Sequence, residues 1–263
     1  MTINFHDQTN KRSYTTRNAD ASWIELMKKI IRTKSVEHAL DIGCGGGIYS
    51  KALAKMGIQE VTGIDFSVTM IDGAKENCRN YNQINFQVGN AFKTELPDKN
   101  FDLVIERALI HHLNDLAACF NEAFRVLKPG GTLVIQDRTP SDCLLEGTCN
   151  HIRGYIFSEF PRLAELEIQR RHNSADLLRE LGMAGFVELE EIKFWETRKF
   201  YPAKEDLLRD IQLRTGRSIL HELNDQELEQ LIEFLDDKIV ETEIIEKDRW
   251  TVWKAVKKHE GEN

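Results

Sequence analysis

One segment constrains the fold of this chain more than any other: the sequence DIGCGGG at residues 41–47. It follows a short apolar run at 38–43 and precedes a run with helical spacing at 48–57. Glycines let the backbone turn tightly and let a ligand approach, while the N–H groups of the following helix point at that ligand. The next apolar run, at 60–65, ends in Asp65, whose carboxylate can accept hydrogen bonds from both hydroxyls of a ribose. The pattern predicts a strand–loop–helix unit that binds a nucleotide-like ligand.

Apolar runs keep alternating with helical patterns through the first half of the chain. Further strands are expected at 84–89, 101–106 and 132–137, and further helices at 19–34, 67–80 and 113–127. Strands that alternate with helices in this way form βαβ units around a parallel sheet. The first half of the chain is therefore predicted to be a doubly wound α/β fold.

The alternation stops after residue 140. Residues 141–171 show no clear pattern, a helix at 174–186 leads into a strand at 187–197, and residues 203–247 are mostly helical before a last strand at 249–257. A connection of about 50 residues between neighbouring strands is too long for a plain loop, so we expect a helical insertion. The predicted fold class is α/β, with a Rossmann-like, doubly wound, seven-stranded and mostly parallel sheet, an antiparallel last strand and a helical cap.

The expected domain organisation follows from these patterns. Residues 1–35 are predicted to form an N-terminal lid segment and helix, and residues 36–263 to form the main domain. Helical insertions of that domain are expected at about 141–171 and 200–247.

Composition narrows the class of protein. The chain has 35 Lys and Arg against 43 Asp and Glu, a net charge of −8, so it lacks the basic surface that general nucleic-acid binding needs. It has no apolar run of about 18 residues for a membrane helix and no apolar N-terminal signal region. Its five cysteines include no CxxC pair, which predicts a reducing, cytoplasmic location without a metal site.

Two details of the glycine loop argue against a nicotinamide dinucleotide. Ile48 stands where the dinucleotide pattern ends in glycine, and an acid, Asp41, lies two positions before the first glycine. A carboxylate there suits a ligand with a cationic amino-acid end better than a pyrophosphate. A nicotinamide-dependent oxidoreductase with the same loop remains an alternative, as does a protein that binds a cofactor without turnover.

Five segments together carry a more specific signal than the loop alone. These are ALDIGCGGG, VTGIDFS, VGNAF, FDLVIERALIHHL and LKPGGTLVI, in this order between residues 39 and 135. In them the chain resembles the class I S-adenosylmethionine-dependent methyltransferases of the small-molecule (UbiE/methyltransferase-11-like) group. The resemblance implies S-adenosyl-L-methionine as cofactor and methyl transfer to an O, N or C nucleophile of a small molecule. A tRNA acceptor is disfavoured by the acidic charge balance.

The resemblance also implies a cofactor site. Asp41, Gly43 and Gly45 match the motif that holds the methionine portion, while Asp65 matches the ribose-binding acid and Phe66 the residue beside the adenine. Asn90 stands where the family more often has an aspartate that contacts the adenine amino group. The full set of expected cofactor-binding residues is Tyr14, Arg17, Asp41, Gly43, Cys44, Gly45, Asp65, Phe66, Met70, Asn90, Ala91, Phe92 and Glu106.

Methyl transfer from a sulfonium is an in-line displacement, so the protein mainly aligns the nucleophile and excludes water. A general base helps when the acceptor is a hydroxyl or an ammonium. His111, after the fourth strand, is the candidate catalytic residue, although a histidine there can also be structural.

The acceptor should be recognised outside the shared core. The candidates are Arg138, Tyr155, Phe157, Phe160, Arg170 and Arg171, each of which can instead serve packing. Trp195, Trp250 and Trp253 are expected in the core of the last two strands. The apolar stripe at 229–245 is expected to pack against the domain or, in a homodimer, against a second copy.

Overall fold

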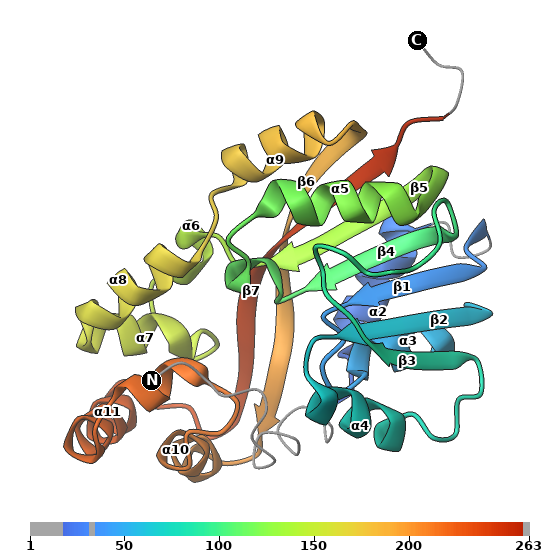
Figure 1. Cartoon of the computed structure of the whole chain (residues 1–263). Helices are drawn as coiled ribbons and strands as arrows, with labels where there is room; N and C mark the ends of the chain where they lie inside the picture. Colours follow the sequence, from blue (N-terminus) through green and yellow to red (C-terminus); the bar gives the residue numbers. More distant parts are fainter. Residues whose placement is uncertain (1–17, 32–34, 260–263) are drawn as a thin grey trace. The chain divides into compact units, whose positions relative to one another are not determined.

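The computed structural model describes residues 18–31 and 35–259 and shows one seven-stranded sheet (Figure 1). Its strand order is β3-β2-β1-β4-β5-β7-β6, with β1 to β5 parallel to one another and β7 antiparallel to β5. The strands are β1 (His38–Ile42), β2 (Glu60–Asp65), β3 (Ile84–Val88), β4 (Phe101–Arg107), β5 (Leu127–Asp137), β6 (Phe186–Tyr201) and β7 (Ile244–Lys257). The predicted fold class is confirmed.

The chain divides into two compact units, each made of several segments. The sheet unit contains the described residues up to Asp137, residues 172–193 and residues 251–259. The helical unit contains residues 138–171 and 194–250. Strands β6 and β7 each contribute residues to both units, and within the described residues the chain passes from one unit to the other four times.

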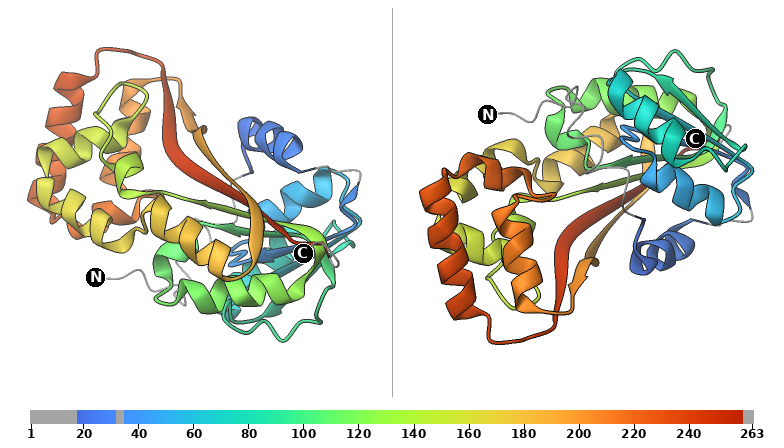
Figure 2. Two further views of the ribbon diagram at one scale, coloured as in Figure 1. Left: turned by 90° about the horizontal axis from the view of Figure 1, so that it is seen from above. Right: turned by 90° about the horizontal axis from the view of Figure 1, so that it is seen from below.

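In the sheet unit, α2 and α3 cover one face of the sheet, while α5 and α9 cover the other (Figure 2). Its helices are α2 (Ala21–Ile30), α3 (Ile48–Lys55), α4 (Val68–Asn77), the 3₁₀ helix η3 (Ile110–His112), α5 (Leu116–Val126) and α9 (Ser174–Met183). Ser67 accepts from the Met70 N–H and thereby caps α4. Fully buried Leu40, Phe120 and Trp253 lie in the core of this unit.

The helical unit has an apolar core of its own. Its helices are α6 (Pro140–Cys143), α7 (Ile152–Glu159), α8 (Pro161–Arg170), α10 (Lys204–Gln212), the 3₁₀ helix η4 (Ser218–Glu222) and α11 (Asp225–Lys238). The apolar stripe of α11, with Leu231 and Leu235 fully buried, packs into this core together with Phe157 and Phe160. Within 18–31 and 35–259, no helix has the length and apolar character needed to span a membrane.

Several sequence-based boundaries were wrong; strand β6, for example, runs to Tyr201 and not to 197. Helix α5 begins at Leu116 and not at 113, because the Asp115 side chain accepts from the Ala118 N–H there. Strand β5 begins at Leu127, across a bulge in its pairing with β4. Strand β7 begins at Ile244, five residues before the expected start, because its inward positions include buried carboxylates that hide the apolar alternation.

One expected core residue was also wrong. Trp195 is 40% exposed, whereas Trp250 and Trp253 are buried as expected. The Trp195 ring instead lies beside two polar side chains of the helical unit, with the His151 ring centroid at 5.3 Å and the Arg249 guanidinium at 5.3 Å.

Candidate active site

The glycine loop turns over the end of β2. The Gly43 and Cys44 N–H groups both donate to the Ile64 carbonyl, at 2.8 and 2.9 Å. Gly45 has a φ of +51°, and a Cβ added there would meet no atom within 4 Å. The backbone at Gly45 therefore borders open space, in the left-handed conformation that favours glycine. This loop follows β1 at the point where the strand order reverses, which is where open α/β sheets bind ligands.

Asp65 closes β2 beside this loop. Its carboxylate accepts from the Gly45 N–H at 2.9 Å and from the Ser67 N–H at 2.9 Å. A carboxylate oxygen accepts more than one hydrogen bond, and a carboxylate in this position is suited to ligand hydroxyls. The next residue, Phe66, is 58% exposed, so an apolar ring face lies directly after the acid. The two residues expected to contact ribose and adenine are thus placed together at the end of one strand.

Asp41 lies on β1, in the strand before the loop. It is 2% exposed, and its Oδ2 accepts from the Ser50 hydroxyl of α3 at 2.6 Å. Burial raises the pKa of Asp41 to about 6, although the Ser50 hydrogen bond opposes the rise. A carboxylate buried beside a hydroxyl, with the Arg107 charge only a minor influence, gains from a cationic ligand group.

The expected adenine-binding turn uses part of its polar groups internally. The Asn90 side-chain carbonyl accepts from the Phe92 N–H at 2.8 Å. The Asn90 oxygen and the Phe92 N–H are thus hydrogen-bonded to each other. The Ala91 N–H and the Asn90 amide NH₂ are the donors of this turn that we expect to contact an adenine. Two other expected residues have buried side chains: Met70 is 3% exposed and Cys44 is 7% exposed.

Glu106 is placed away from the other acids of the expected site. Asp41 pairs with Ile105 across the sheet and Glu106 with Ile42, so the two acidic side chains point to opposite faces. The Glu106 Oε1 accepts from the Cys119 thiol of α5 at 3.4 Å, while its Oε2 has no hydrogen-bond partner in the described part of the chain. Burial raises the pKa of Glu106 to about 7, against the Cys119 hydrogen bond. A cofactor contact by this side chain remains a prediction, and Tyr14 and Arg17 lie outside the described residues.

His111 is held by an acid that the sequence analysis did not single out. Its Nδ1 lies 2.8 Å from the Asp137 Oδ2, and its backbone N–H donates to the same oxygen. Asp137 is 1% exposed and ends β5. A carboxylate accepts only, so it fixes the proton on Nδ1 and leaves Nε2 as the basic nitrogen. The signal for Asp137 was its position at the carboxyl end of a parallel strand, next to strand β4, which precedes His111.

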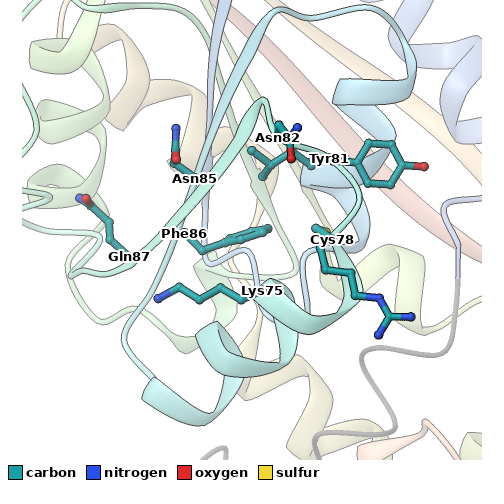
Figure 3. A pocket seen from close by; sticks show the side chains of 9 residues that line it. Lys75, Cys78, Tyr81, Asn82, Asn85, Phe86 and Gln87 are labelled. Atoms are coloured by element: carbon teal, nitrogen blue, oxygen red, sulfur yellow. The ribbon is translucent and has the colours of Figure 1, made fainter.

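A hollow of about 560 Å³ lies elsewhere, along the edge strand β3 and helix α4 (Figure 3). Its lining includes Lys75, Tyr81, Asn85 and Phe86 and none of the expected cofactor residues. The glycine loop, not this hollow, therefore remains the candidate site.

Comparison with known proteins places the chain among methyltransferases. Residues 40–135 match a family described as a methyltransferase domain. Over 175 residues the chain is 33% identical to demethylmenaquinone methyltransferase of Tropheryma whipplei, which covers 66% of this chain and 70% of that protein. It is 28% identical to a ubiquinone biosynthesis O-methyltransferase of Coxiella burnetii, over 71% of this chain and 78% of that one.

A solved structure shares the fold. Phosphoethanolamine N-methyltransferase 2 of Haemonchus contortus, in complex with phosphomonomethylethanolamine and S-adenosylhomocysteine, superposes with a TM-score of 0.63 at 20% identity. The alignment covers 98% of this chain and 61% of that one.

Proposed function

The chain belongs to the class I S-adenosylmethionine-dependent methyltransferases, and from that premise we propose which of its residues carry out methyl transfer to a small molecule. When bound, S-adenosylmethionine supplies a methyl group activated by a positively charged sulfur. The glycine loop, Asp41, Asp65 and Phe66 are the residues that we propose bind it.

The residues present fit this cofactor. The open space at Gly45 admits a ligand against the backbone, and the Asp65 carboxylate beside it is suited to the ribose hydroxyls. The buried carboxylate of Asp41 can pair with the ammonium group at the amino-acid end of the cofactor. The open, positive-φ backbone of Gly45 next to the Asp65 carboxylate is the observation that carries the proposal.

We propose that His111 accepts a proton from the methyl acceptor. Asp137 orients the ring and stabilises the positive charge that forms when Nε2 takes up that proton. Such a base serves a hydroxyl or ammonium acceptor, whose lone pair must be free before it attacks. Identification of the labelled product decides whether the methyl group is transferred to O, N or C of the acceptor.

We further propose that the helical unit recognises the acceptor. The relatives of Tropheryma and Coxiella are named for demethylmenaquinone and for ubiquinone biosynthesis, and the Haemonchus enzyme was solved with phosphomonomethylethanolamine. Small molecules of such different shape cannot be recognised by the shared glycine loop. A part of the chain with its own core, such as residues 138–171 and 194–250, can vary with the acceptor.

Calorimetry tests the cofactor site. We expect S-adenosylmethionine to bind and NAD not to bind, and Gly45→Val to abolish binding because the branched side chain is strained at this φ and fills the ligand's space. Gly182→Val is a matched control, since its added Cβ also meets nothing within 4 Å but lies in α9. Binding of S-adenosylmethionine by Gly45→Val with normal affinity would contradict the assignment.

Turnover separates an enzyme from a binding protein. Methyl-labelled cofactor is incubated with fractionated metabolites, and label is expected in one fraction together with formation of S-adenosylhomocysteine. His111→Gln should lower the rate of that transfer and leave cofactor affinity unchanged. Binding without product in any fraction would instead support a protein that has kept the cofactor site and lost turnover.

A further inference from the structure

The helical unit buries many arginine side chains. They are Arg138, Arg153, Arg171, Arg198, Arg217 and Arg249, with side-chain exposures between 3% and 23%. A guanidinium stays charged in a protein, so each buried one needs an anionic partner. Two of the partners are clear: Arg138 lies 2.8 Å from Asp248, and Arg171 lies 2.8 Å from Glu167.

Arg153 lies near both of these carboxylates, but each of them is closer to another arginine. Its Nε lies 3.6 Å from an Asp248 oxygen and its Nη1 lies 3.9 Å from a Glu167 oxygen, both beyond hydrogen-bond distance. The side chain is only 12% exposed, and among the described residues its buried Nε has no hydrogen-bond partner. Arg153 is therefore a nearly buried guanidinium that can still bind an oxyanion.

His151 has a second buried polar atom, Nε2, that lacks a hydrogen-bond partner among the described residues. It is 2% exposed, and its Nδ1 lies 3.0 Å from the Glu146 carbonyl oxygen. A carbonyl only accepts, so Nδ1 carries the proton and Nε2 presents a lone pair, for which 18–31 and 35–259 offer no hydrogen-bond partner. Burial lowers the pKa of His151 below its usual value, which keeps this lone pair free near neutral pH. The ring thus needs a donor, such as a hydroxyl.

Both residues lie at the start of α7. His151 is the N-cap residue and makes no side-chain hydrogen bond to the first turn, while Arg153 is the second residue of the helix. The uncapped amides and the helix dipole give this end a partial positive charge. One end of one helix therefore combines a guanidinium, a positive dipole and a hydrogen-bond acceptor.

We propose that the helical unit binds an oxyanion that also carries a hydroxyl group, at the N-terminus of α7, and that this group belongs to the methyl acceptor. Arg153 binds the anionic oxygens, for which its planar fork is suited, and the hydroxyl donates to the His151 Nε2. Phosphate and hydroxy-carboxylate groups share this chemistry. The assignment to the acceptor rests on the proposed function, whereas the binding site itself does not.

Simple anions test the site on the full chain. Inorganic phosphate carries a hydroxyl at pH 6.5 and sulfate does not, so phosphate should bind more tightly in calorimetry at equal ionic strength. At ten times its dissociation constant, phosphate should raise the Tm by about 3–5 °C. Glycolate and acetate form the corresponding carboxylate pair, and the better of phosphate and glycolate identifies the type of anion.

Variants assign the site to its residues. Arg153→Gln should lose phosphate binding at least tenfold, and His151→Leu should reduce phosphate to the affinity of sulfate. Arg153→Lys serves if Arg153→Gln does not fold, and should also bind at least tenfold more weakly because it lacks the fork. Arg162→Gln is the matched control, since Arg162 is an exposed arginine of α8 paired with Glu227, and it should bind like the wild type.

Two results would overturn the inference. Equal binding of phosphate by wild type and Arg153→Gln, or by wild type and Arg153→Lys, would make Arg153 a purely structural ion-pair member. Wild type that binds S-adenosylmethionine but neither phosphate nor glycolate would refute the site and leave the proposed function standing. Binding of phosphate without S-adenosylmethionine would instead refute the proposed function.

Discussion

Two buried acids of the sheet unit and two of the helical unit have pKa values shifted in opposite directions. In the sheet unit, burial raises the pKa of Asp41 to about 6 and that of Glu106 to about 7. In the helical unit burial acts in the same direction, but arginines outweigh it. Arg171 and Arg153 lower the pKa of Glu167 to about 2, and Arg138 and Arg153 hold the pKa of Asp248 well below its usual range.

The difference lies in what satisfies each acid. The helical unit supplies cations from its own chain, so its acids are ionised in the folded protein and stabilise it. In the sheet unit, Asp41 and Glu106 have hydroxyl and thiol donors, from Ser50 and Cys119, which stabilise a carboxylate less than a cation does. Glu122 of the same unit has an arginine partner, Arg125, and its pKa is lowered to about 2. A buried acid paired with an arginine is part of the structure. A buried acid with only hydroxyl or thiol donors is either available to bind a cationic ligand or lowers the stability of the fold when it ionises. Four predictions test this comparison.

The largest effect is expected for Asp248→Ala. The substitution removes the carboxylate that Arg138 and Arg153 share and leaves buried positive charge. We expect a loss of about 3–5 kcal/mol in the free energy of unfolding, measured by urea denaturation. Asp206→Ala, which breaks the exposed pair with Arg209, should cost less than about 1 kcal/mol. Similar losses in the two variants would contradict the role given to the buried arginines.

Glu106 should make stability depend on pH. The folded state keeps the Glu106 proton up to about pH 7, whereas the unfolded state loses it near the ordinary 4.5, so folding stability falls as pH rises between these values. Over that window the loss is about 3 kcal/mol, at about 1.4 kcal/mol per pH unit. Urea denaturation of Glu106→Gln should lack this decline, while the exposed Glu229→Gln should keep it. A wild-type profile equal to that of Glu106→Gln would refute the assignment.

Asp65→Ala tests an acid satisfied by backbone amides. Loss of its hydrogen bonds to the cofactor should weaken S-adenosylmethionine binding by about 2 kcal/mol, roughly thirtyfold, in calorimetry. Asp102→Ala is a matched control, because Asp102 also accepts from two backbone N–H groups, those of Glu37 and His38, but lies at the opposite end of the strands. Equal loss in both variants would indicate damage to the fold instead of to the site.

The smallest effect concerns Asp41 and the cofactor. Below pH 6 the carboxyl gains a proton and no longer attracts an ammonium group, so affinity should fall by up to about tenfold per pH unit. Calorimetry at pH 5, 6 and 7 measures this slope, and Asp41→Asn should bind weakly with no slope. An affinity that is constant from pH 5 to 7 would show that the ammonium does not depend on Asp41.

The sequence predicted the sheet unit far better than the helical unit, and the acids explain why. The buried positions of strands β1, β2 and β4 are mostly apolar, so these strands can be identified as apolar runs in the sequence. The start of β7 was missed because Glu246 and Asp248 occupy its inward positions and are buried as ion pairs with arginine. Ion pairs between distant segments leave no periodic signal.

The candidate site was predicted as a set of residues and not as contacts. The glycine loop and Asp65 follow directly from the motif, and the structure places them together. The contact between Asp137 and His111 was not predicted, because it depends on which strands are neighbours in the sheet. The hydrogen bond from the Phe92 N–H to Asn90 was not predicted either, because it depends on the rotamer of the Asn90 side chain. Both depend on tertiary structure, which no local pattern records.

The position of β7 has a consequence for biosynthesis. Among the described strands, β7 comes after β5 and β6 in the sequence but lies between them in the sheet. While the ribosome still holds residues 244–257, β5 and β6 cannot gain their shared neighbour, and their backbone groups remain open to pairing with other chains. Strand β7, with the fully buried Trp253, completes the sheet only once these residues have left the ribosome. Nascent chains of this protein are therefore expected to depend on protection from aggregation until β7 has emerged.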